Sequence, residues 1–168
     1  MASIATEAHL PAIDHHRREE VGRELQATLV ELIDLSLLGK QLHWNIFGRP
    51  FKPLHEHLDE LVDSWRELSD IVAERAVAVG YSPDGQAAAV SRGSGITPVD
   101  AGALATDTAT RELVERLADI SERIRGRMDR LGEIDLASQT SWSRSCASSR
   151  SSSGCCARRC LPERAIAP

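Results

Sequence analysis

The chain has 168 residues, a formal net charge of −5 and 42% hydrophobic residues, which is enough for one well-cored domain and excludes a collagenous or wholly disordered protein. No run of about 18 apolar residues occurs, and the N-terminus has no apolar signal-like segment, so we expect a cytoplasmic protein with no membrane contact. The acidic balance argues against a nucleic-acid binder that works by bulk charge and fits a protein that concentrates cations.

The first two predicted elements are a flexible arm and a long helix. Residues 1–18 are polar and interrupted by Pro11, which is typical of a mobile arm. From 19 to 47 apolar side chains recur every three or four residues, which predicts an amphipathic helix. Gly48 and Pro50 end it.

A second long helix is predicted with Pro53 in its first turn and an end at Val79, where Gly80 stops it. Residues 81–105 then form a long connection, in which residues 85–91 can make one short helix. A connection of this length between bundle helices usually crosses between parallel neighbours.

A third long helix is predicted over residues 106–131, and residues 132–135 are suited to a turn and cap into a fourth helix. The predicted fold is therefore all-α, a ferritin-like four-helix bundle over residues 19–139 with a long crossover between the second and third helices.

The expected fourth helix is missing from the printed sequence. Residues 140–168 hold all four cysteines, five arginines and one acid, with no apolar period. Back-translated with GC-rich codons and shifted by one inserted nucleotide after Gln139, the same stretch encodes DVLVEVVRELEEQLWMLRAQVPA followed by a stop codon. The pattern of that segment predicts an amphipathic helix, which would supply the missing fourth helix of the bundle. We therefore interpret residues 140–168 as the product of a frameshift, which scrambles or removes the fourth helix.

Four polar residues share one face of the second helix. His55 and Asp59 are spaced i, i+4, as are Asp70 and Glu74, and the eleven residues from Asp59 to Asp70 turn about 1100°, or three turns and about 20° more. On a helix taken at random, four such residues more often form a solvent-exposed polar face. The alternative interpretation of these four residues is that they are ligands of a metal centre.

One copy of the chain cannot close that centre, because Asp59 and Asp70 lie about 16 Å apart along the helix axis. A second copy, antiparallel and crossing near Ser64 and Trp65, brings each half of the set opposite the other half and creates two equivalent sites. His43, near the end of the first helix, can add a second imidazole.

The ligand types favour iron. Imidazole and carboxylate suit it, and a mixed set of this kind leaves positions open for an oxidant. Metal sites inside a ferritin bundle use Glu-x-x-His motifs, and this sequence has none, which leaves a site between subunits.

Three segments together resemble the Dps family, the DNA-binding proteins from starved cells, over about residues 19–139. They are KQLHWNIFG at 40–48, LHEHLDEL at 54–61 and DIVAERAVAVG at 70–80. The resemblance implies a mini-ferritin with a ferroxidase centre, in which His43, His55 and Asp59 come from one subunit and Asp70 and Glu74 from its twofold mate.

The resemblance also implies a hollow dodecamer that oxidises Fe(II), preferentially with hydrogen peroxide, stores ferric iron and thereby protects DNA, without an organic cofactor. Trp44 matches the family's aromatic residue beside the centre. Glu133 and Asp135 lie in the region where acidic residues line a pore, although a capping role for Asp135 is an equal alternative.

Two other functions stay open. One is a nucleoid-associated protein that compacts DNA, for which the N-terminal arm offers only Arg17 and Arg18 among acids, and the tail offers arginines if it is real. The other is a scaffold bundle without chemistry. Trp65 is predicted to be a core or interface anchor, and His57 a surface residue.

Overall fold

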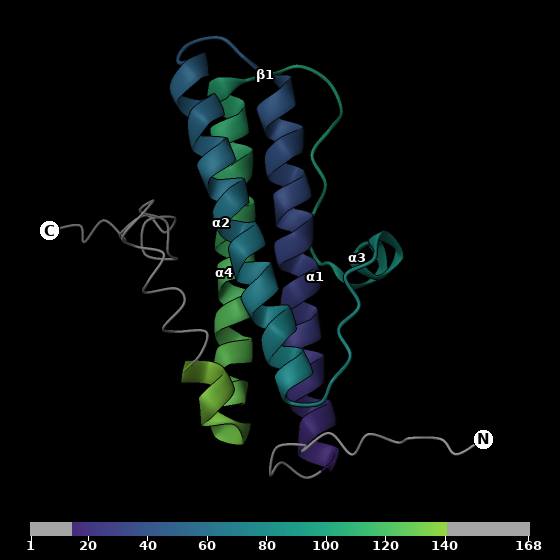
Figure 1. Cartoon of the computed structure of the whole chain (residues 1–168). Helices are drawn as coiled ribbons and strands as arrows, with labels where there is room; N and C mark the ends of the chain where they lie inside the picture. The colour runs from purple at the N-terminus through teal and green to yellow at the C-terminus, as the bar shows by residue number, and fades with distance from the viewer. Residues whose placement is uncertain (1–14, 141–168) are drawn as a thin grey trace, which may run out of the picture.

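The all-α prediction is confirmed by the structure, a computed structural model that describes residues 15–140 (Figure 1). Its elements, in chain order, are α1 (His15–Asn45), β1 (Ile46–Phe47), α2 (Phe51–Ala78), α3 (Ala87–Gly93), β2 (Leu104–Ala105) and α4 (Thr106–Ile134). Residues 136–140 form a further short helical stretch. None of the helices in this range combines the length and the apolar composition of a membrane span.

The helix boundaries differ from those predicted by a few residues. Helix α1 begins at His15, inside the predicted arm, and ends at Asn45 because Ile46 and Phe47 pair in parallel with Leu104 and Ala105. This small two-stranded pairing ties the α1–α2 corner to the start of α4. Nothing in the local sequence pattern predicts it.

The connection and the end of α4 also follow the prediction with a shift. The short helix α3 covers residues 87–93, two residues later than expected. Helix α4 runs three residues past its predicted end at residue 131, into the predicted turn, and ends at Ile134. The Asp135 carboxylate then accepts hydrogen bonds from the backbone N–H groups of Ala137, at 3.2 Å, and Ser138, at 3.3 Å. Asp135 therefore caps the short helical stretch that follows.

The core lies along α1, which packs against both α2 and α4, and buried side chains of all three helices share it. Trp65 is buried in it, as predicted for a core anchor. A Cβ atom at Gly39 would lie 2.6 Å from a Val62 methyl carbon and 2.8 Å from the Trp65 ring. The glycine therefore allows the last third of α1 to approach the middle of α2 closely.

Buried charge joins α1 to α4. The Glu31 carboxylate is 1% exposed and accepts hydrogen bonds of 2.6 Å from Arg123 Nε and 2.6 Å from Arg127 Nη1. At the surface of the same helix pair, Arg130 binds both oxygens of Glu24, at 3.0 and 2.9 Å. Two carboxylates on one face of α1 thus fix its register against α4.

Two sequence interpretations lie outside the described residues. They are the greater part of the N-terminal arm, residues 1–14, and residues 141–168, nearly all of the tail that we interpret as the product of a frameshift.

Candidate metal centre

Three of the five predicted ligands come together where α1 ends and α2 begins. The rings of His43 and His55 stack with their centroids 3.5 Å apart. His43 Nδ1 lies 3.1 Å from Asp59 Oδ1 and 3.1 Å from the His55 carbonyl oxygen. The i, i+4 spacing of His55 and Asp59 on α2 and the close packing of α1 on α2 produce this cluster.

The backbone fixes which ring nitrogens are available to a cation. His55 Nδ1 lies 3.2 Å from the His43 carbonyl oxygen, so each imidazole faces the other residue's carbonyl through Nδ1. A carbonyl can only accept, so each neutral ring satisfies it by keeping the proton on Nδ1. The lone pair on Nε2 is then free in both rings, which is the form in which histidine binds metal.

The Asp59 carboxylate already binds a positively charged side chain. Lys40 Nζ lies 2.5 Å from Asp59 Oδ1. This hydrogen bond, supported by the charge of Lys40, holds the pKa of Asp59 below its ordinary value and outweighs the opposing effect of desolvation. Asp59 is therefore ionised at neutral pH and held in an arrangement that already accepts positive charge.

The other two predicted ligands lie on the same helix but far from this cluster. Asp70 and Glu74 are exposed and form no ion pair or side-chain hydrogen bond within residues 15–140. No group of three or more His, Cys, Asp or Glu side chains in that range is placed to hold a metal ion. The described chain thus holds an imidazole-rich half and an acidic half, separated along α2.

The remaining predicted site residues have varied surroundings. Trp44 follows His43 in α1, and its side chain is 70% exposed. His57 is exposed as predicted and lies 3.4 Å from Glu60. Asp135 is bound by Arg75 at 2.8 Å, whereas Glu133 is exposed. The pore assignment of Glu133 and Asp135 stays a prediction.

Sequence reasoning missed two neighbours of the cluster. They are Lys40 and the ring of Phe51, which stacks on His55 with a centroid distance of 4.9 Å. Lys40 precedes His43 by three residues and therefore shares its helix face. This spacing could have indicated from the sequence that Lys40 lies near the cluster.

Comparisons with known proteins identify a family and several relatives. A family model described as a ferritin-like domain matches residues 23–140. The DNA protection during starvation protein of Mycolicibacterium smegmatis is 31% identical over 132 residues, covering 77% of this chain and 71% of that one. DNA protection during starvation protein 2 of Deinococcus radiodurans is 31% identical over 126 residues, and the chain spans only about half (52%) of its length.

Solved structures agree with these relatives. The tetragonal form of Mycobacterium smegmatis Dps superposes with a TM-score of 0.78 at 26% identity, covering 87% of this chain and 88% of that one. Dps from Microbacterium arborescens in the high iron form gives a TM-score of 0.75 at 26% identity, covering 84% and 92%. Both similarities extend over most of the helical region.

Proposed function

Because this chain belongs to the Dps family of ferritin-like proteins, we propose that it oxidises Fe(II) and stores the ferric product in a hollow, dodecameric shell. The ferroxidase centre is shared between two copies. His43, His55 and Asp59 of one copy face Asp70 and Glu74 of the other. The relatives' names, which describe DNA protection, and a solved relative in a high iron form support this role.

The division of α2 into two halves is the observation that carries the proposal. One end has two imidazoles and a carboxylate in contact, and the other end has two exposed acids on nearly the same helix face. An antiparallel second copy of α2 brings unlike halves together and forms two equivalent centres around one twofold axis. The ligands of the two halves then face each other across the axis.

The chemistry follows from the ligand set. Each Fe(II) gives up one electron, so one hydrogen peroxide molecule with two protons oxidises two Fe(II) ions and leaves two water molecules. The Nε2 atoms of His43 and His55 bind Fe(II) well, while the carboxylates stabilise Fe(III) by their charge. Consuming Fe(II) and peroxide together removes both sources of the hydroxyl radicals that damage DNA.

A complementation experiment tests the shared centre. We expect His43→Ala/His55→Ala/Asp59→Ala and Asp70→Ala/Glu74→Ala proteins to be inactive alone and to recover about a quarter of the wild-type rate of Fe(II) oxidation after mixing. In random assembly half of the twofold interfaces are mixed, and each mixed interface has one intact centre of two. The rate is measured by the appearance of ferric absorbance after peroxide is added to the anaerobic Fe(II) protein.

The control mixes the same two variants before subunit exchange, as verified by native mass spectrometry of isotope-labelled chains. Activity should be absent then and appear as mixed species form. Complete exchange without any recovery would mean that the two halves do not act together.

Lys40 gives a second prediction. Replacing it by methionine removes the ammonium that binds Asp59, so a divalent cation no longer has to displace it. We expect severalfold to about tenfold tighter binding of Zn(II), a redox-inert stand-in for Fe(II), by calorimetry. The pKa of Asp59 should rise at the same time, because the Lys40 hydrogen bond is the largest cause of its lowering.

Lys52→Met is the matched control for this change. Lys52 is a highly exposed lysine near the start of α2, 3.5 Å from Glu56. Its removal subtracts the same formal charge and should leave Zn(II) affinity nearly unchanged. Equal effects of the two substitutions would show that only net charge matters.

A further inference from the structure

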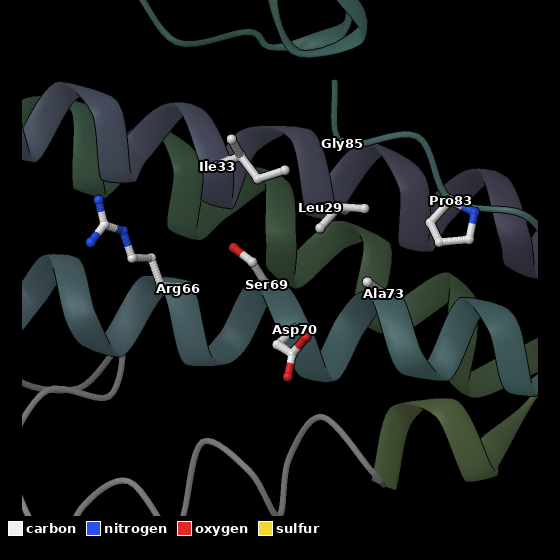
Figure 2. Close-up of a pocket in the computed structure, with 8 residues that line it drawn as sticks. All are labelled: Leu29, Ile33, Arg66, Ser69, Asp70, Ala73, Pro83 and Gly85. Carbon is white, nitrogen blue, oxygen red and sulfur yellow. The ribbon is translucent and has the colours of Figure 1, made fainter. Parts of the chain in front are cut away.

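An open groove of about 360 Å³ runs between α1 and α2 beside the acidic half of the proposed centre (Figure 2). Leu29 and Ile33 of α1 face Ala73 of α2 across it, and Pro83 closes one end. Asp70 lies at its edge. The groove therefore joins an apolar floor to one of the proposed iron ligands.

An exposed aromatic side chain, Trp44, lies at the opposite end of the same helix pair. Trp44 is 70% exposed, although a side chain of its size normally buries most of its apolar surface. It directly follows His43, so it lies beside the imidazole half. Each copy thus presents a projecting indole next to one half of the centre and an apolar groove next to the other half.

The proposed twofold axis determines where that indole goes. It pairs Asp59 of one copy with Asp70 of the other, so the imidazole end of one copy lies against the acidic end of its mate. Helices α1 and α2 are antiparallel, because Lys40 contacts Asp59 while Gly39 packs on Trp65. A second copy's Trp44 therefore arrives at the level of this copy's Asp70 and Ala73, where the groove opens.

We propose that Trp44 of each copy inserts into the groove lined by Leu29, Ile33, Ala73 and Pro83 of the other copy and so fixes the distance between the two halves of the centre. The inference rests on the proposed function, because the shared centre defines the axis. Burial of the indole stabilises this contact, in which the ligands of the two halves also approach each other. Arg66, at the other end of the groove, can lie over the indole face.

Photo-crosslinking without iron tests the contact. Trp44 is replaced by benzoylphenylalanine, and ¹⁴N and ¹⁵N chains are mixed, assembled and irradiated. We expect mixed-isotope cross-links to the tryptic peptides that carry the groove lining, which are 24–40 with Leu29 and Ile33, 67–75 with Ala73, and 76–92 with Pro83. The same probe at Val114, an exposed α4 residue, is the control and should not mark these peptides.

A second measurement covers the case in which the probe itself disturbs the interface. Trp44→Ala and the groove-filling Ala73→Leu should each accelerate subunit exchange about 30-fold or more, the size expected for a tryptophan at an interface centre. The double variant should exchange more slowly than the product of the two single effects predicts. Both substitutions disrupt the same contact, so the second has little left to disrupt once the first is made.

The outcomes separate this inference from the proposed function. Cross-links within one chain, cross-links confined to other segments, or chains that remain monomeric would overturn the docking of Trp44. Cross-links in the groove together with absent Fe(II) oxidation would support the docking and contradict the ferroxidase role. Unchanged subunit exchange in both single variants would also overturn the docking.

Discussion

Replacing Asp70 and Glu74 together by alanine is expected to slow Fe(II) oxidation at least about 100-fold while the chain still folds and assembles. Both side chains are exposed in the described chain and form no hydrogen bond or ion pair there, so their removal costs little folding free energy. An imidazole-rich half alone has one carboxylate, which is too little negative charge to stabilise Fe(III). Stopped-flow absorbance after peroxide addition measures the rate.

Glu115→Ala/Asp119→Ala is the control for that variant. These two acids are also exposed and spaced i, i+4, but they lie on α4. The control has the same change in charge and should oxidise Fe(II) at the wild-type rate. A wild-type initial rate in the Asp70/Glu74 variant would remove these residues from the centre.

The second large effect concerns stability. Glu31→Ala should lower the free energy of unfolding by about 3 kcal/mol, because it leaves the guanidinium groups of Arg123 and Arg127 against α1 without their carboxylate. The matched change is Glu24→Ala on the same face of α1, where the partner Arg130 is more than half exposed. That loss should be no more than about 1 kcal/mol.

Denaturant unfolding at one fixed protein concentration measures both, since assembly adds to apparent stability. The variant in which Glu31, Arg123 and Arg127 all become leucine distinguishes charge from packing. It should recover most of the stability, because an apolar replacement removes the stranded charges along with the carboxylate. Equal losses for Glu31→Ala and Glu24→Ala would show that burial does not strengthen this interaction.

The sequence predicts the features that depend on one helix at a time. Apolar periodicity identifies the three long helices, and i, i+4 spacing puts His55 and Asp59 on one face of α2. The contacts that spacing did not predict join different elements, such as Lys40 with Asp59 and the pairing of Ile46 with Leu104. These depend on the relative register of packed helices, which a periodic pattern leaves undetermined.

The prediction of the metal centre was limited in the same way, because it also depends on contacts between separate elements. Residue types and spacing indicate which side chains share a face, but closure of the centre depends on a surface that one chain presents to another. The proposed ligands Asp70 and Glu74 therefore stay predictions from spacing and family resemblance. Their test is the mixed-subunit assay.

The continuity of α2 has a consequence for how this protein can change over evolution. One unbroken helix carries both halves, so its backbone sets both their separation and their rotational phase. Deleting a single residue between Asp59 and Asp70 would swing the acidic pair by about 100° and shorten the spacing by about 1.5 Å in both centres of a dimer at once. We therefore expect natural variants of this segment to differ freely in residue type but not in length.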